Sequence, residues 1–251
     1  MYFALSRGGD ALNAPVILIH GLGSSHLAWP AGLRRMEGQT VYALDLPGHG
    51  KSEGTGLQSA AGNARAVRKF LDAAGTYTAI LVGHSLGAAI ALETARRDPD
   101  RVAGLGLISA GSIFHCSKQS LESIKNPAML ADALSWLAAN LFAAGADIKL
   151  QSRVVDALRQ ARPAVLADDL RACSSYEFTP LPEKCVMPVL AIHGSQDQIV
   201  LKQDAQHLVH SIPGAKLVNI PSAGHMVMLE APDRVGNLIT RFVRQVNTRE
   251  K

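Results

Sequence analysis

Short apolar runs recur along the chain and alternate with longer amphipathic segments. Runs rich in Val, Ile and Leu are typical of strands buried on both faces of a parallel sheet. Such runs predict strands at residues 15–21, 41–45, 79–83, 102–109, 188–194 and 215–221. Helical spacing between them predicts helices near 58–74, 86–97, 201–211 and 234–246. This alternation is typical of an α/β fold, with a mostly parallel sheet that has helices on both faces.

The alternation stops at one long segment, residues 112–183. A connection between a strand and a helix usually needs only a few residues. Helical spacing at 131–142 and at 151–160, with two prolines at their boundaries, predicts a helical insertion here. An insertion at the carboxyl edge of the sheet would lie over the place where open α/β sheets bind ligands. The expected division is therefore a core of residues 1–111 and 184–251 and a helical lid of residues 112–183.

A single serine stands at the junction of a predicted strand and helix, in the sequence Gly83-His84-Ser85-Leu86-Gly87. A serine on so tight a turn has a strained backbone, and a Cβ at either flanking glycine would clash with it. Backbone strain usually persists where the side chain has a use. The alternative interpretation is a glycine-softened joint with a capping serine.

A serine hydroxyl becomes a useful nucleophile when a base takes its proton and a third group orients that base. Asp197 follows the predicted strand 188–194, and His225 follows the strand 215–221 on a Gly-His turn. The chain order of serine, acid and histidine is the one expected for this kind of sheet. The other common place for the acid, after the strand 102–109, has no carboxylate, which favours Asp197.

The same chemistry needs N–H donors for the oxyanion of a tetrahedral intermediate. One expected donor is the backbone N–H of Leu86, next to the serine. The other is the backbone N–H of Leu22, in the glycine-flanked loop after the first apolar run. Because the backbone supplies both groups, the Leu22 side chain would shape the pocket and not the chemistry.

Five motifs now stand in order along the chain: HGLGSS, DLPGHGKS, GHSLGAA, HGSQD and AGHMVMLEAP. With these motifs the chain resembles the α/β-hydrolase fold family through nearly its whole length. The resemblance implies a catalytic triad of Ser85, Asp197 and His225. It also implies that the two leucine N–H groups form the oxyanion hole and that the lid is the family's cap.

Several residues near these motifs are candidates for the wall of a substrate pocket. They are His26, Trp29, Phe114, Cys116, Trp136, Tyr176 and Met226. Packing between lid and core explains Trp136 equally well. Other polar residues near the motifs receive a structural interpretation, as anchors of loops and turns. They are His20, Asp45, His49, Ser52 and His84.

Composition narrows the class of protein. Of the 251 residues 47% are hydrophobic and 18% charged, which is typical of one globular domain. The net charge of +4 comes from scattered basic pairs without interleaved aromatics, so we expect no nucleic-acid binding. No apolar stretch suits a signal peptide or a membrane span, so we expect a cytoplasmic protein without membrane insertion. Three cysteines without metal spacing favour reduced thiols and no metal site.

The sequence thus predicts a carboxylesterase-like serine hydrolase that acts on small to medium esters through an acyl-enzyme, without a cofactor. A thioesterase, a lactonase, a C–C bond hydrolase and a weakly catalytic ligand receptor remain open, because one fold supports many chemistries. Met226 follows the histidine where C–C bond hydrolases often show an aromatic residue, which disfavours that alternative. The oligomeric state also remains open.

Overall fold

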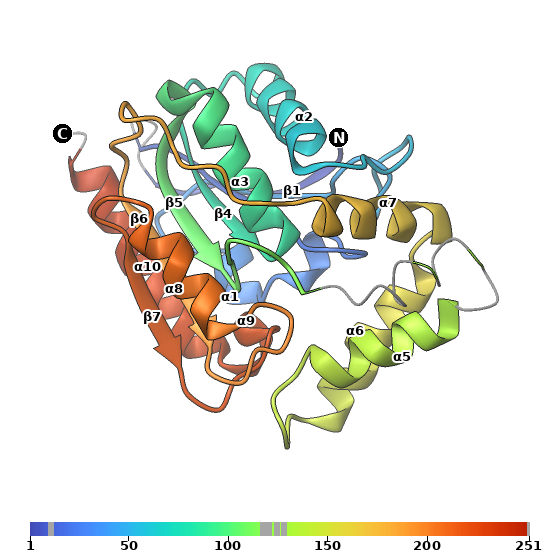
Figure 1. Cartoon of the computed structure of the whole chain (residues 1–251). Helices are drawn as coiled ribbons and strands as arrows, with labels where there is room; N and C mark the ends of the chain where they lie inside the picture. The colour runs from blue at the N-terminus through green and yellow to red at the C-terminus, as the bar shows by residue number, and fades with distance from the viewer. Residues whose placement is uncertain (10–12, 116–121, 123–125, 127–129, 250–251) are drawn as a thin grey trace.

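The computed structural model describes residues 1–9, 13–115, 122, 126 and 130–249. Within those residues the protein has one seven-stranded sheet in the order β1-β3-β2-β4-β5-β6-β7 (Figure 1). Strands β2 to β7 are parallel, and β1 pairs antiparallel with β3. The strands are β1 (Phe3–Ser6), β2 (Val16–Ile19), β3 (Val41–Leu44), β4 (Ala79–His84), β5 (Val102–Ile108), β6 (Val189–Gly194) and β7 (Lys216–Ile220). All six predicted strands are present, and the predicted fold class is confirmed.

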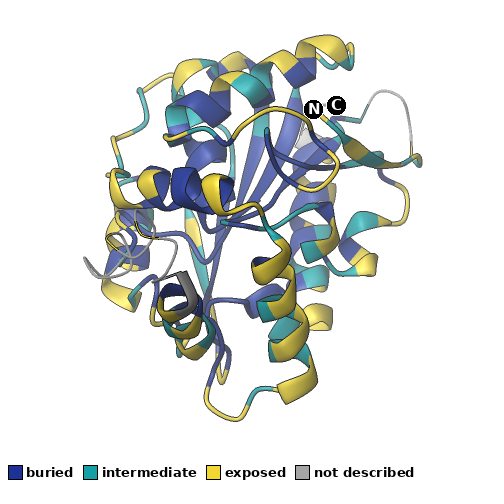
Figure 2. Ribbon diagram, turned by 90° about the vertical axis from the view of Figure 1, so that its right-hand side faces the viewer, coloured by how far each residue is buried: buried dark blue, intermediate teal, exposed yellow. Residues whose placement is uncertain are grey.

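Helices cover both faces of the sheet, and the apolar side chains of the strands divide between them (Figure 1). In β2, Ile17 and Ile19 join the core cluster on one face, while Val16 and Leu18 join the cluster on the other. This alternation explains why the central strands are apolar at every position. The first face carries α2 (Ala60–Ala73), α3 (Leu86–Arg97) and α8 (Lys202–His210), and the second carries α1 (Ala31–Arg34) and α10 (Pro232–Arg249). In Figure 2 these helices turn buried residues inward and exposed residues outward.

The predicted helical insertion lies between β5 and β6. Its described helices are α5 (Leu130–Asn140), α6 (Ile148–Gln160) and α7 (Pro163–Ser174), and they extend beyond one end of the sheet (Figure 1). The sequence predicted α5 and α6 but missed α7. Pro163, interpreted as a boundary, occupies the first turn of α7, where proline is well tolerated because the N–H there has no helical partner. The candidate Cys116 lies outside the described residues.

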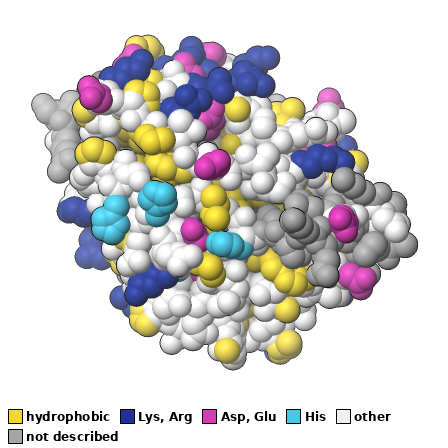
Figure 3. Space-filling model, in the orientation of Figure 1, with side chains coloured by type: hydrophobic (Ala, Val, Ile, Leu, Met, Phe, Trp, Pro, Cys, Tyr) yellow, Lys and Arg dark blue, Asp and Glu magenta, His cyan; other side chains and the backbone are white. Residues whose placement is uncertain are grey.

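The loops that carry the candidate residues leave the same edge of the sheet. Because neighbouring parallel strands point the same way, the carboxyl ends of β2, β4, β6 and β7 lie together. Three short helices, η1 (His26–Ala28), η2 (Pro99–Arg101) and α9 (Val227–Glu230), connect the longer elements. On the face drawn in Figure 3, the described Lys and Arg side chains lie in separate groups among acidic ones. No helix in the described part of the chain has the length and apolar character that crossing a membrane requires.

Candidate active site

Ser85 lies on a strained turn between β4 and α3. Its φ is 54° and its ψ is −120°, in a region that L residues rarely adopt. The flanking glycines leave room for this turn. A Cβ on Gly83 would overlap the carbonyl oxygen of Gly87, and a Cβ on Gly87 would overlap that of Ile19 on β2. The turn therefore requires glycine on both sides of the serine, as the sequence predicted.

The structure brings Ser85, His225 and Asp197 into one hydrogen-bonded chain. The Nε2 atom of His225 is 2.8 Å from Ser85 Oγ. On the other side of the ring, Nδ1 is 2.9 Å from Asp197 Oδ2 and 3.0 Å from Oδ1. Because a carboxylate only accepts hydrogen bonds, Nδ1 carries the proton and Nε2 accepts the serine hydroxyl. All three side chains are buried, so solvent does not compete for these bonds.

Asp197 is held as a charged carboxylate. Burial alone would raise its pKa, but the neighbouring His225 ring and the hydrogen bonds it accepts outweigh burial and lower the pKa below 3.8. Two of these bonds come from the backbone N–H groups of Ile199 and Val200, each 2.9 Å from Oδ1. The carboxylate is therefore fixed in place and ionised at neutral pH.

Two side chains from neighbouring strands hold the backbone of the histidine loop. Ser109, at the end of β5, donates from Oγ to the carbonyl oxygen of His225 at 2.7 Å. His84 donates from Nε2 to the same oxygen at 3.0 Å. Sequence analysis missed Ser109, which was noted only as a position without a carboxylate. Its φ of 50° is the structural sign that this position is specialised.

Both expected oxyanion donors belong to segments that adjoin Ser85. Leu86 is the first residue of α3, and the first N–H groups of a helix have no partner within it. Leu22 follows Gly21, which lies directly against the nucleophile turn. A Cβ on Gly21 would be 3.2 Å from Ser85 Cβ and 3.0 Å from His84 Nδ1. A larger residue at position 21 would therefore require His84 or Ser85 to shift by a few tenths of an ångström.

A cavity of about 920 Å³ opens above Ser85 and His225. It lies between the loop after β2 and the inserted helices, and most of its described lining is apolar. Its lining includes four predicted pocket residues: Trp29, Phe114, Trp136 and Met226. Leu22, from the expected oxyanion loop, also lines it. Tyr176 lines a separate hollow of about 190 Å³ beside α2 and α3.

A model of the alpha/beta hydrolase family matches residues 16–238. The chain belongs to the alpha/beta hydrolase family. It is 31% identical over 95% of its length to a dihydrolipoyllysine-residue acetyltransferase component of an acetoin cleaving system from Pseudomonas putida, and it spans 65% of that relative. It is 28% identical to a pimeloyl acyl-carrier-protein methyl ester esterase from Aromatoleum aromaticum, over 93% of this chain and 100% of that protein.

A solved structure shares the fold of this chain over almost its whole length. It is a thermophilic esterase from Thermogutta terrifontis, with a TM-score of 0.85 and 24% sequence identity. The likeness covers 98% of this chain and 93% of the esterase. The core strands and the inserted helices of this chain therefore form an arrangement that an esterase also has.

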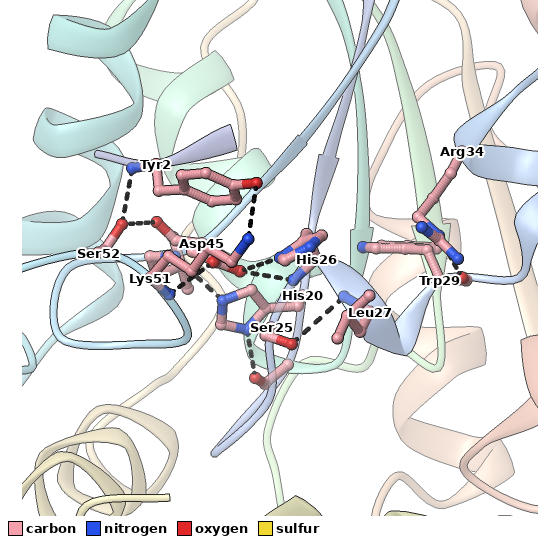
Figure 4. A network of polar contacts seen from close by, with 12 residues as sticks. Tyr2, His20, Ser25, His26, Leu27, Trp29, Arg34, Asp45, Lys51 and Ser52 are labelled. Carbon is pink, nitrogen blue, oxygen red and sulfur yellow. Dashed lines mark hydrogen bonds and ion pairs between the residues drawn. The ribbon is translucent and has the colours of Figure 1, made fainter. Parts of the chain in front are cut away.

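His26, predicted to line the pocket, is not among the residues that line the cavity above Ser85. Its Nδ1 atom lies 2.8 Å from Asp45 Oδ1, which also accepts the His26 backbone N–H at 2.7 Å (Figure 4). The opposite side of the ring lies against Tyr2, with ring centroids 5.3 Å apart. The carboxylate turns the imidazole away from the cavity, and the exposed Leu27 beside it lines the cavity instead. The prediction for His26 was wrong, because the local sequence does not reveal the hydrogen bond between His26 and Asp45.

His20 anchors the loop that leads to Leu22. Its Nε2 accepts the N–H of Leu46 at 3.0 Å, and Nδ1 donates to the carbonyl oxygen of Gly21 at 2.8 Å (Figure 4). One nitrogen accepts and the other donates, which is the pattern of a neutral imidazole. Burial, followed by the charge of His49, lowers the pKa of His20 to about 3.

Two buried neutral imidazoles predict a loss of stability in mild acid. Burial, followed by the charge of His225, lowers the pKa of His84 to about 3, as for His20. After unfolding both rings take up a proton near pH 6.5, so the free energy of unfolding falls as the pH drops below 6.5. At a pH of about 5 the expected loss is about 2 kcal/mol for each ring.

Urea unfolding followed by circular dichroism at about pH 7 and about pH 5 measures this effect. His49 acts in the opposite direction, because its raised pKa adds stability as the pH falls through that value. The gain from His49 is complete near pH 6.5, so among these three rings only His20 and His84 change the stability between pH 6.5 and pH 5, and the expected change there is a loss. A stability that stays constant or increases on going to pH 5 would contradict the neutral state of His20 and His84.

Proposed function

We propose that the protein is a serine hydrolase that cleaves small to medium carboxylic esters through an acyl-enzyme. The observation that carries this proposal is the hydrogen-bonded chain from Ser85 through His225 to Asp197 beside a mostly apolar cavity. The likeness of this chain to an esterase structure and to a methyl ester esterase supports the same reaction class. Catalytic roles for these three residues follow from their chemistry.

In the first half of the reaction, Ser85 Oγ attacks the ester carbonyl carbon while its proton passes to Nε2 of His225. The charged Asp197 stabilises the imidazolium that forms. The carbonyl electron pair moves onto oxygen, and the N–H groups of Leu22 and Leu86 bind this oxyanion. When the carbonyl re-forms, the C–O bond to the alcohol breaks and His225 returns the proton to the departing oxygen.

In the second half, water replaces the alcohol. His225 takes a proton from the water as the hydroxide oxygen attacks the acyl carbon, and a second oxyanion forms in the same place. Its collapse breaks the bond to Ser85 Oγ and returns the proton to the serine. The carboxylic acid then leaves. Besides the ester and water, every group in this scheme belongs to the chain.

The cavity suggests the kind of ester. Its volume of about 920 Å³ lies within the range of small-molecule sites, roughly 300 to 1,000 Å³. Inserted helix α6 contributes Leu150 and Val154 opposite Trp29 of the core. The described lining contains no Asp or Glu, so it suits neutral or anionic substrates better than cationic ones. We propose that residues 112–183 act as a lid that closes the acyl site over the core of residues 1–111 and 184–251.

Steady-state hydrolysis of p-nitrophenyl acetate, butyrate, octanoate and palmitate tests the proposal. We expect turnover with the three shorter esters and a lower kcat/KM for palmitate, because α6 and α7 bound the acyl site. Ser85→Ala is the control that identifies hydrolysis at this site. Folded wild-type protein without turnover of any of these esters would contradict the proposed function.

A further inference from the structure

One acidic side chain of the inserted helices reaches the core beside the expected oxyanion donor. Asp169 lies on α7 and is 1% exposed. Its Oδ2 atom accepts the backbone N–H of Gly23 at 2.8 Å and lies 2.8 Å from Nε2 of His49. A single carboxylate oxygen thus joins α7 to two loops of the core, the one after β2 and the one after β3.

Gly23 directly follows Leu22, so the bond to the Gly23 N–H restrains the backbone on one side of Leu22, while the bond from His20 to the Gly21 carbonyl restrains the other. The φ of Gly23 is 61°, a conformation that favours glycine. A Cβ at this position would overlap Leu166 and approach Leu158, both from the inserted helices. The backbone at residues 22–23 is therefore held by the insertion, through apolar packing and through Asp169.

The partner of Asp169 in the core is a charged imidazole. His49 Nδ1 lies 3.1 Å from the carbonyl oxygen of Pro47, while Nε2 faces the carboxylate. Because both nitrogens face acceptors, only the doubly protonated ring donates to both. Burial opposes the charge, but the hydrogen bond and charge of Asp169, followed by the Pro47 carbonyl and Asp45, outweigh it and raise the pKa of His49.

Within the described residues, the other polar groups beside His49 do not take the place of Asp169. The His20 ring packs against His49 with centroids 4.8 Å apart and stays neutral. Arg162, also from the insertion, donates to the carbonyl oxygen of Gly48 beside His49. A buried ion pair is weak evidence for stability, since desolvation offsets much of the attraction. The hydrogen bond of Asp169 with Gly23, on the oxyanion loop, is what sets this ion pair apart.

We propose that Asp169 is a positioning residue for the oxyanion hole. By accepting the Gly23 N–H while His49 fixes its carboxylate, Asp169 directs the Leu22 N–H toward the oxygen that becomes negatively charged. The hole is then complete only while α7 is docked on the core. This inference rests on the proposed function, since it assigns a role within the same reaction.

The chain offers a matched control in the adjacent residue. Asp168 also lies on α7, is 9% exposed and accepts a hydrogen bond from a core side chain, Gln58, at 3.0 Å. It also pairs with Arg171 at 2.9 Å. Within the described part of the chain, neither of these two contacts of Asp168 involves the oxyanion loop. Asp168→Ala therefore removes a carboxylate that joins α7 to the core and leaves Gly23 in place.

The experiment compares kcat and KM for p-nitrophenyl butyrate, and the affinity of a trifluoromethyl ketone, whose serine adduct carries an oxyanion. For Asp169→Ala we expect kcat to fall about tenfold to a hundredfold with little change in KM, because only transition-state binding is lost. The affinity for the trifluoromethyl ketone should fall by a similar factor. Asp169→Asn should restore most of kcat, since its amide oxygen accepts the Gly23 N–H. Asp168→Ala should change kcat little.

A second measurement covers the case in which Asp169→Ala does not fold. In the wild type, kcat should fall at alkaline pH as His49 loses its charge, because the neutral ring holds the Asp169 carboxylate less strongly than the imidazolium does. In Asp169→Asn this fall should disappear, because a neutral amide does not depend on the charge of His49 to stay in place. Three results would overturn the inference. The first is an equal loss of kcat in Asp168→Ala and Asp169→Ala, and the second is a change in KM alone in Asp169→Ala. The third is an identical alkaline profile of kcat in the wild type and Asp169→Asn. Wild-type protein without Ser85-dependent turnover would instead overturn the proposed function.

Discussion

Replacing Ser85 with alanine is expected to lower kcat for a p-nitrophenyl ester by roughly 10⁴- to 10⁶-fold. The hydroxyl is the group that forms the acyl-enzyme, and no neighbouring side chain replaces it 2.8 Å from His225 Nε2. Folding should be retained, because alanine keeps the Cβ and the serine hydroxyl has its bond only within the site. Steady-state kinetics and a thermal melt of the same preparation measure both effects.

Variants of His225 and Asp197 test whether Ser85 acts within a triad or as a lone reactive serine. His225→Ala should lower kcat about as far as Ser85→Ala, and the double variant should fall little further, because triad members act as a unit. Asp197→Asn should lose less, since the amide keeps part of the ring's orientation. Wild-type activity in Asp197→Ala would show that another group orients the histidine.

The sheet was predictable because its central strands are buried on both faces. In β4 every residue from Ala79 to His84 is buried, so the apolar run itself marks the strand. The missed strand β1 has alternating exposed and intermediate positions and pairs antiparallel with β3 at the sheet edge. Its four residues are too few for an alternating pattern to stand out. Phe3 packs on the rings of Tyr42 and Phe70, contacts that no local pattern reveals.

The candidate triad was also accessible from the sequence, for a topological reason. Each of its three residues follows a strand, and parallel neighbouring strands bring their carboxyl ends together. The contacts of the inserted helices were not accessible in this way. Asp169 is 146 residues from Gly23 and 120 from His49, and nothing in the local pattern of α7 distinguishes it from Asp168. His26 fails for the same reason, because its partner Asp45 lies on another loop.

Gly87 makes the tightest backbone contact at the nucleophile turn, and its replacement is the second substitution with a large expected effect. Gly87→Ala should lower the free energy of unfolding by about 3 kcal/mol or more, although alanine is the better helix former by about 1 kcal/mol. The new Cβ would overlap the carbonyl oxygen of Ile19 and lie 2.6 Å from that of His20. Both oxygens belong to the backbone of β2 and the loop after it, so neither moves without disturbing the sheet. Urea unfolding at constant pH measures the change.

Gly236→Ala is the matched control, because Gly236 lies within α10 and a Cβ there would meet nothing within 4 Å. That variant should gain up to about 1 kcal/mol from helix propensity alone. The difference between the two variants isolates the steric contact from the intrinsic preference of the helix. If Gly87→Ala is as stable as Gly236→Ala, then α3 does not lie as close to β2 as the structure has it. Any Gly87→Ala protein that folds should also lose kcat, since moving α3 away from β2 displaces Ser85 from His225.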